Sequence, residues 1–319
     1  MNNNNPPKLA IVIPCYNEEA VLAYTLDHLR QYLQTLIDNH KITPDSFLYC
    51  VDDGSNDQTW SIITTQHQQF PNIKGLKLTK NVGHQNALLA GLLSIKNKID
   101  CVISIDADLQ DDVSAMEAML DQLKAGYDIV YGVRTSRQKD SFFKRVTALT
   151  FYHIMKKSGA DIVHNHADFR LLSQRVIASL NQYKERNLFL RGIFPLMGYR
   201  STQVYYERHE RLLGQSKYTL KKMIMLAWDG ITSFSHIPLS LILALGVMSF
   251  FLSIVMMIWI FCAKIFTSSA VPGWASIMIP LCFMGGIQLL SIGIIGEYMA
   301  KVYLEVKRRP RFIKETELN

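Results

Sequence analysis

The sequence predicts an α/β domain followed by two apolar helices that are each long enough to cross a membrane. In the first half of the 319-residue chain, short apolar runs alternate with longer amphipathic stretches, which is typical of a parallel α/β sheet. Nearer the C-terminus, Ile237–Ala263 and Ile277–Gly296 contain no charged residue. The hydrophobic fraction of 49% is thus unevenly distributed, and the length suffices for one α/β domain with additional elements.

Strands and helices are expected to alternate through the first third of the chain. The strands are predicted at Leu9–Ile13, Phe47–Val51, Gly75–Leu78 and Cys101–Ile105, and the helices at Glu19–Leu36, Trp60–Gln68 and Gln85–Ser94. A polar cluster follows each strand: Tyr16-Asn17-Glu18, Asp52-Asp53, Asn81, and Asp106 with Asp108. Ligands bind beyond the carboxyl ends of the strands in open α/β sheets, so these clusters predict a ligand site at one edge.

Each apolar run near the C-terminus is long enough to cross a bilayer as a helix, because about 20 helical residues span roughly 30 Å of hydrocarbon. A buried core helix is the alternative for either run. Basic residues lie before the first run and after the second, whereas Lys264 is the one basic residue between them. The positive-inside rule then predicts transmembrane helices at 237–263 and 277–298, an external link at 264–276 and a cytosolic tail at 299–319.

The other segments are expected to stay in the cytoplasm. Residues 1–7 are Asn-rich, lack the apolar core of a signal peptide and are expected to be disordered. An α/β domain over 8–215 would include one interfacial amphipathic helix at 141–157, and a second would occupy 216–236. A helix packed on the sheet is the alternative for each. The net charge of +7 suits anionic lipid or phosphate, no nucleic-acid-binding motif is found, and the five cysteines have no paired spacing.

The acidic clusters have specific chemical interpretations. Asp106 and Asp108 stand one residue apart after a strand, and oxygen ligands at this spacing suit Mg²⁺ or Mn²⁺, with Gln110 as a candidate neutral ligand. Solvated loop acids are the alternative. Asp52 and Asp53 could accept hydrogen bonds from a base or a ribose, or cap the next helix. The segment 81–86 could bind phosphate or ribose at a helix N-terminus, or form an ordinary cap.

Four motifs in one order resemble the inverting nucleotide-sugar glycosyltransferases with the GT-A fold, a Rossmann-like mixed sheet. They are Pro14-Cys-Tyr-Asn-Glu18, Asp52-Asp-Gly-Ser-Asn-Asp57, Asn81-Val-Gly-His84 and Asp106-Ala-Asp-Leu-Gln110. Later segments resemble the polyprenyl-phosphate glycosyltransferases, above all the bactoprenol glucosyltransferases: Ala167–Leu171, Glu185–Phe189, Arg211–Tyr218, Gly230–Ser235 and Gly285–Tyr298. The likeness extends from Leu9 to about Phe312, whereas dolichol-phosphate mannose synthases are similar over the catalytic part alone.

The resemblance implies roles for individual residues. Asp52 and Asp53 would hold uracil and ribose, beside further donor-site residues: Pro14, Tyr16, Asn17, Glu18, Asn81 and Gly83. Asp106, Asp108 and Gln110 would serve the metal, and Asp168 would be the catalytic carboxylate alongside Asp108. Phosphate would be held by four basic residues: Arg134, Arg137, Arg211 and Lys217.

Asp168 has two further interpretations. It could be a structural acid paired with Arg170 or another basic residue. A phosphate monoester is already mostly a dianion at neutral pH, because its second pKa is about 6. Such an acceptor needs a positive cradle more than a general base. We therefore expect Asp168 to orient the acceptor or its cationic partners as much as to take a proton.

The predicted activity is metal-dependent, inverting transfer of a hexose, glucose from UDP-glucose, to undecaprenyl phosphate. Other UDP-sugars, such as N-acetylglucosamine or a modified pentose donor, remain open. A processive polysaccharide synthase is disfavoured because Asn187 follows Arg186 where a tryptophan would be needed. A non-catalytic membrane scaffold is the alternative from another class. The resemblance also implies a homotetramer in the cytoplasmic membrane, with the catalytic domain and both termini in the cytoplasm.

Overall fold

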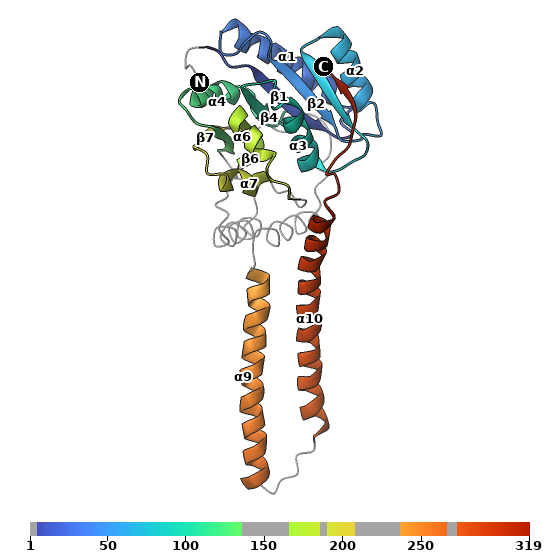
Figure 1. Ribbon diagram of the computed structural model, residues 1–319, viewed down its shortest axis with the longest axis vertical. Coiled ribbons are helices and arrows are strands. Elements are labelled where there is room, and N and C mark those ends of the chain that lie inside the picture. Colours follow the sequence, from blue (N-terminus) through green and yellow to red (C-terminus); the bar gives the residue numbers. More distant parts are fainter. Residues whose placement is uncertain (1–4, 136–165, 186–189, 208–236, 267–272) are drawn as a thin grey trace. The chain divides into compact units, whose positions relative to one another are not determined.

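The chain forms two compact units, one built on a β-sheet and the other consisting of two long helices. The computed structural model describes residues 5–135, 166–185, 190–207, 237–266 and 273–319 (Figure 1). The sheet unit includes the end of the chain, Arg309–Asn319, and the helical unit lies between it and the rest of the sheet unit in sequence. The two predicted interfacial helices, at 141–157 and 216–236, lie outside the described residues.

An eight-stranded mixed sheet forms the centre of the first unit, in the order β7-β5-β6-β4-β1-β2-β3-β8. The strands are β1 (Leu9–Cys15), β2 (Phe47–Asp52), β3 (Ile73–Leu78), β4 (Cys101–Ser104), β5 (Ile129–Arg134), β6 (His166–Ser173), β7 (Ser201–Tyr206) and β8 (Lys314–Leu318). Its helices are α1 (Leu22–Asp38), α2 (Thr59–Gln69), α3 (His84–Ile95), α4 (Ala115–Lys124), α6 (Gln174–Leu180) and α7 (Leu190–Leu196). The predicted α/β fold with a mixed sheet is confirmed, although β5 to β8 were not predicted individually.

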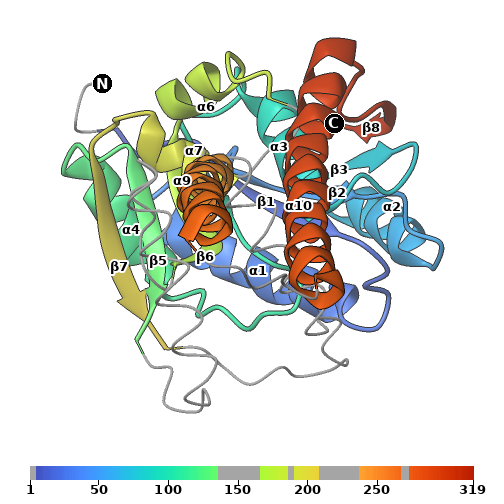
Figure 2. The same cartoon turned by 90° about the horizontal axis from the view of Figure 1, so that it is seen from below.

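The central strands are buried along their whole length because helices cover both faces of the sheet (Figure 2). On one face, alternate residues of β1 such as Leu9 and Ile11 join a core with apolar residues of α1 and α4. On the other face, α3 approaches β1 and β2 closely: a Cβ at Gly91 would lie 2.7 Å from Val51 and 2.8 Å from Val12. Continuous apolar strands are therefore expected here, since neither face meets water.

The pairing of β4 with β6 brings residues from later in the chain to the edge of the sheet where β4 ends. Because β6 runs antiparallel to β4 and Ser104 is paired with Arg170, Asp168 lies next to the chain that continues from Ser104 towards Asp106. The hydroxyl of Ser104 donates a hydrogen bond of 2.5 Å to the carbonyl of Asp168. β6 thus places Asp168 near the carboxyl end of β4.

The last residues of the chain form the edge strand β8, which pairs antiparallel with β3. Within the predicted cytosolic tail at 299–319, residues up to Lys307 continue a long helix and Lys314–Leu318 join the sheet. The hydroxyl of Tyr49 donates to Glu317 over 3.0 Å, and Lys77 lies 3.1 Å from Glu315. β8 covers an edge that would otherwise expose unpaired backbone groups.

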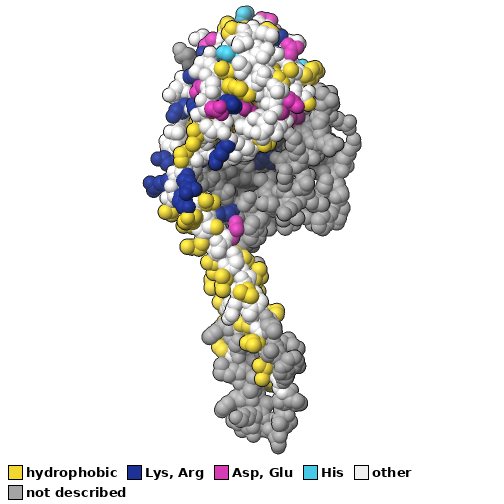
Figure 3. Space-filling model, turned by 90° about the vertical axis from the view of Figure 1, so that its right-hand side faces the viewer, with side chains coloured by type: hydrophobic (Ala, Val, Ile, Leu, Met, Phe, Trp, Pro, Cys, Tyr) yellow, Lys and Arg dark blue, Asp and Glu magenta, His cyan; other side chains and the backbone are white. Residues whose placement is uncertain are grey.

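The second unit contains α9 (Ile237–Phe266) and α10 (Trp274–Lys307). Among the described residues, Phe283–Lys307 is long and apolar enough to cross a membrane. Exposed apolar side chains cover much of α10, including Leu289, Ile292 and Val302, and Figure 3 shows such side chains along the helical unit. Three exposed basic residues end this stretch, Lys307, Arg308 and Arg309. That the two helices form a membrane hairpin stays a prediction.

Candidate active site

The loop after β1 is joined to the loop after β2 by several hydrogen bonds. Asn17 has a positive φ of 52°, its side chain accepts the Asn56 N–H at 2.9 Å, and its own N–H donates to Ser55 at 3.0 Å. The N–H of Glu18 donates to the hydroxyl of Thr59 at 2.9 Å. Of the other predicted donor-site residues, Pro14 lies within buried β1, and Tyr16 is 37% exposed. The structure thus joins two motifs of the sequence by hydrogen bonds.

Asp52 and Asp53 at the end of β2 are both buried, but they have different surroundings. Asp53 accepts the backbone N–H groups of Val82 at 2.7 Å and of Gly83 at 3.0 Å, and it therefore fixes the loop before α3. Asp52 accepts the N–H of Ser55 at 3.2 Å through Oδ1, whereas its buried Oδ2 has no hydrogen-bond partner among the described residues. Burial raises the pKa of both carboxyls above its ordinary value.

Asp106 and Asp108 lie beyond β4 in a tight loop in which Leu109 has a φ of 50°. Burial by the surrounding protein and the nearby carboxylates of Asp168, Asp111 and Asp108 raise the pKa of Asp106 to about 6, although 37% of its side chain is exposed. Crowded carboxylates of this kind fit a divalent cation, which would relieve their repulsion. No group of three His, Cys, Asp or Glu suited to a metal occurs within the described ranges, so the remaining ligands would come from Gln110, water or a substrate.

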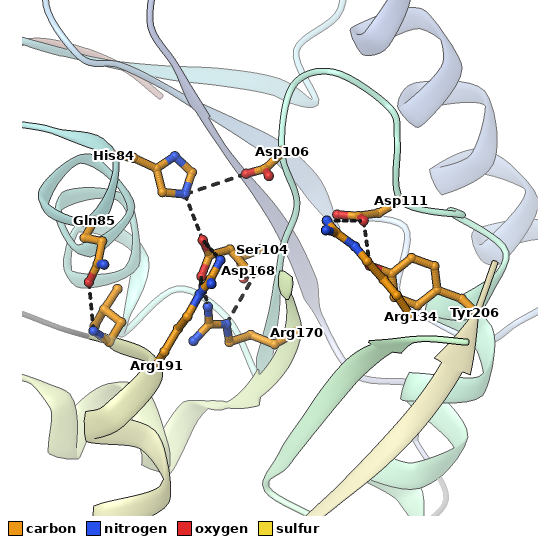
Figure 4. A network of polar contacts seen from close by, with 11 residues as sticks. His84, Gln85, Ser104, Asp106, Asp111, Arg134, Asp168, Arg170, Arg191 and Tyr206 are labelled. Carbon is orange, nitrogen blue, oxygen red and sulfur yellow. Dashed lines mark hydrogen bonds and ion pairs between the residues drawn. The ribbon is translucent and has the colours of Figure 1, made fainter. Parts of the chain in front are cut away.

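Asp168 is surrounded by positive side chains. Its carboxylate pairs with the fully buried Arg170 and accepts two hydrogen bonds from Arg191, Nε to Oδ1 at 3.2 Å and Nη2 to Oδ2 at 3.1 Å (Figure 4). Burial alone would raise the pKa of Asp168, but the charges of Arg191 and Arg170 outweigh burial and hold it well below its usual value. The carboxylate is therefore a poor proton acceptor, and the pairing with Arg170 that the sequence left open is present.

His84, the first residue of α3, stands between the two acids. Its Nε2 lies 3.5 Å from Oδ2 of Asp168 and 3.6 Å from Oδ1 of Asp106, and Figure 4 shows the ring pointing at both. Burial opposes a charge on the ring, but the contact with Asp168 and the charge of Asp106 outweigh it and raise the pKa of His84 to about 9. An imidazolium at this point offsets the repulsion between the carboxylates of Asp106 and Asp168.

The basic residues expected to hold phosphate are only partly described. Arg134, at the end of β5, lies 3.1 Å from the buried carboxylate of Asp111, and its Nε is 3.2 Å from the Tyr206 hydroxyl. Tyr206 in turn donates to Asp111 at 2.5 Å. Arg134 therefore belongs to a separate polar cluster with Asp111 and Tyr206, which Figure 4 shows. Arg137, Arg211 and Lys217 lie outside the described residues.

Sequence reasoning missed His84 and Arg191 as site residues. His84 was visible as the end of the motif Asn81-Val-Gly-His84, of which Asn81 and Gly83 are exposed in the structure. Arg191 carried no signal, because only the folded chain brings the start of α7 against β6. The antiparallel register of β6 is likewise invisible in a scan for alternating strands and helices.

Comparison with known proteins agrees with this geometry. Residues 10–180 match the family model described as Glycosyl transferase family 2. The chain is 49% identical to the uncharacterized glycosyltransferase YkoT of Bacillus subtilis (strain 168), over 98% of this chain and 92% of that protein. It is 34% identical to the prophage bactoprenol glucosyl transferase homolog of Escherichia coli (strain K12), over 96% of this chain and 98% of that protein.

Among solved structures, the mannosyl-3-phosphoglycerate synthase of Rubrobacter xylanophilus is similar with a TM-score of 0.48 and 14% identity, over 70% of this chain and 72% of that chain. The family assignment rests on the sequence comparisons, which extend over nearly the whole length of both partners. With its mixed sheet and its acidic loops at the carboxyl ends of the strands, the chain belongs to glycosyl transferase family 2 and is a glycosyltransferase.

Proposed function

We propose that this glycosyltransferase transfers a hexosyl group from a UDP-sugar to a polyprenyl phosphate, with inversion at the anomeric carbon. Glucose from UDP-glucose and undecaprenyl phosphate are the first candidates, because relatives named bactoprenol glucosyl transferase are 34% and 35% identical over nearly the whole chain. The observation that carries the proposal is the carboxylate of Asp168, held by two guanidinium groups directly beside the acidic loop of Asp106.

The donor is expected at the ends of β1, β2 and β4. The Oδ2 of Asp52, which has no hydrogen-bond partner among the described residues, could accept an N–H from the base, while Asp53 keeps the loop before α3 in place. A divalent cation, Mg²⁺ or Mn²⁺, held by Asp106 and Asp108 with Gln110 nearby would offset the negative charge of the departing diphosphate. The acids alone would repel that diphosphate.

The acceptor phosphate is expected on the side of Asp168. Arg170 and Arg191 contribute two positive charges against the single negative charge of Asp168, so this cluster has excess positive charge. Arg191 is 37% exposed and can present its guanidinium to an incoming phosphate. Arg170 is buried and pairs with the carboxylate of Asp168. Arginine forms bidentate contacts with phosphate, which makes this the natural place for an anionic nucleophile.

The transfer needs no enzyme base. An oxygen of the acceptor phosphate, already ionised at neutral pH, forms a bond to the anomeric carbon while the bond from that carbon to the donor diphosphate breaks. Asp168 stays ionised throughout, because its two arginines keep its pKa low. Its role is to hold Arg191 in position, so that attack comes from the face opposite the leaving group.

The lipid acceptor agrees with the second unit of the chain. The exposed apolar surface of α10, followed by Lys307, Arg308 and Arg309, suits a bilayer core with an anionic headgroup layer at its edge. We propose that α9 and α10 both span the cytoplasmic membrane and that the sheet unit is cytoplasmic. This arrangement would keep the enzyme next to a phosphate that emerges from the lipid.

The assay is transfer from radiolabelled UDP-glucose to undecaprenyl phosphate by the full-length protein in detergent, measured as organic-soluble label. We expect product with Mg²⁺ or Mn²⁺, loss of more than about 100-fold in kcat for Asp108→Asn if the metal stabilises the leaving group, and little change for Glu315→Gln on the far strand β8. A panel of other UDP-sugars identifies the donor if UDP-glucose is inactive. Absence of product with every UDP-sugar would favour a non-catalytic scaffold.

A further inference from the structure

The start of α3 contacts two separate parts of the site through its first two residues. His84 faces Asp106 and Asp168, as described above. Gln85 points to a different partner: its Oε1 accepts the backbone N–H of Leu190 at 2.8 Å, across a sequence separation of 105 residues (Figure 4). α3 itself is fixed from the other side, since Asp53 binds the N–H groups of Val82 and Gly83 just before it.

Leu190 is the first residue of α7, and Arg191 is the second. The first N–H groups of a helix have no acceptor within the helix, so an outside acceptor is needed to satisfy them. Gln85 supplies that acceptor to Leu190, whose side chain is also buried. The backbone that carries Arg191 is thereby attached to α3 at the adjacent residue.

We propose that Gln85 is a positioning residue that holds the start of α7 so that Arg191 stays on Asp168. Three contacts connect these residues: Asp53 fixes the loop before α3, Gln85 fixes α7 to α3, and Arg191 makes a two-bond contact with Asp168 that tolerates little displacement. The described part of α7 has 7 residues, so its own helical hydrogen bonds offer little to keep this turn in place.

In the reaction, Gln85 should affect the lipid phosphate and not the UDP-sugar. This part of the inference rests on the proposed function, in which Arg191 meets the acceptor phosphate. Among the described residues, Gln85 makes no hydrogen bond with Asp52, Asp106 or Asp108. Losing its side-chain oxygen should therefore disturb the binding of the lipid phosphate and spare the binding of the UDP-sugar. A misplaced guanidinium costs rate steeply, since a shift of about 1 Å can reduce the rate roughly 100-fold.

The test compares Gln85→Leu, which removes the acceptor oxygen, with Gln85→Glu, which keeps one at the same reach. Both are made in the full-length protein in detergent. Kinetics are measured with undecaprenyl phosphate varied at saturating UDP-sugar, and UDP binding is measured by calorimetry. For Gln85→Leu we expect kcat/KM for the acceptor to fall by about 10-fold to 100-fold, with UDP affinity unchanged within about 2-fold, and for Gln85→Glu values near those of wild type.

A second readout does not need activity. Hydrogen exchange of a peptide covering Leu190–Leu196 should become faster in Gln85→Leu and stay near wild type in Gln85→Glu. If no UDP-sugar is transferred by wild type, the proposed function fails while this exchange result still tests Gln85. The inference is overturned if Gln85→Leu leaves both exchange and acceptor kinetics unchanged, or if Gln85→Leu and Gln85→Glu lose UDP binding alike.

Discussion

At the scale of single residues, the behaviour of Asp168 depends on what surrounds it more than on its own chemistry. An isolated carboxylate beside a reacting centre would be read as a general base. Here Arg170 and Arg191 both bind it, and its pKa is held well below the ordinary range. A group that is never protonated near neutral pH can organise charges but transfers no proton, which suits an acceptor that is already ionised.

Asp168→Asn should therefore destabilise the protein as well as impair transfer. The substitution leaves Arg170 buried without its counter-charge, which costs about 3 kcal/mol or more. For a domain of this size, that lowers Tm by roughly 6–12 °C. Thermal unfolding of the full-length protein in detergent measures the shift.

Asp27→Asn is the matched control for this prediction, because Asp27 is 51% exposed in its pair with Arg30 on the surface. Its Tm should stay within about 2 °C of wild type, since substitutions outside buried networks change stability by about 0.5 kcal/mol. Equal Tm values for wild type and Asp168→Asn would contradict the view that the carboxylate supports Arg170.

At the scale of elements, β8 connects the end of the chain to the edge of the sheet. Its backbone pairs with β3, and the N–H of Thr79 donates to the carbonyl of Ile313 at 3.1 Å, just before the loop that Asp53 holds. Glu317 reaches inward to the Tyr49 hydroxyl and also lies 3.6 Å from Lys98. The strand therefore contributes side-chain contacts as well as edge protection.

Stability should depend on pH through Glu317. Burial opposes its ionisation, but hydrogen bonds from Lys314 and Tyr49 outweigh burial and hold its pKa below the ordinary value. A lowered folded-state pKa adds stability above the unfolded pKa of about 4.3, and this stability is lost as pH falls through the folded value. Glu317→Gln should lower Tm at pH 6, by an amount equivalent to about 1 kcal/mol or less, and the difference should shrink below about pH 4.

Glu315→Gln provides the comparison on the same strand, because Glu315 is 44% exposed in its pair with Lys77. Exposed pairs contribute little, so this variant should follow wild type at every pH. If the two variants have the same pH profile, the contact between Tyr49 and Glu317 adds no stability to the edge.

The elements also show which parts of the fold a sequence can predict. Strands β1 to β4 and helices α1 to α3 were predictable because each apolar run is followed by polar turn residues at the same edge. β5 to β8 were not, because their identity depends on pairing partners far away in sequence, such as Lys314 with Leu78. For the same reason the sequence motifs indicated Asp106 and Asp168 separately, whereas only the folded chain shows that His84 lies next to both.

At the scale of the whole molecule, the two units have different surfaces and therefore suit different solvents. The described part of the sheet unit buries most of its apolar side chains, including those of Cys15, Cys50 and Cys101. The helix α10 exposes large apolar side chains over most of its described length. Such a surface is unfavourable in water and favourable in hydrocarbon, so the chain as a whole fits an enzyme held at a membrane.

The proposed topology predicts where an added thiol can be labelled from outside the cell. With Cys262 and Cys282 replaced by serine, the remaining cysteines are buried, and burial raises the pKa of the Cys15, Cys50 and Cys101 thiols, so they should not react. A cysteine at Gly273, just before α10, should react with a membrane-impermeant maleimide in intact cells. A cysteine at Asn319 should react only after the membrane is opened, because the basic residues that follow the apolar part of α10 favour the cytoplasmic side.

Labelling of both positions from outside would place the sheet unit on the wrong side for a cytosolic UDP-sugar and would contradict the proposed orientation. Labelling of neither position in intact cells, with both reactive after the membrane is opened, would mean that α9 and α10 do not carry Gly273 across. In that case the exposed apolar surface of α10 would have to be covered by protein or lie along the bilayer surface. The expected pattern, in which Gly273→Cys alone is labelled in intact cells, requires that α10 crosses the bilayer. Because β8 pairs with β3, the rest of the sheet lies on the same side as Asn319, so α9 must cross the bilayer as well.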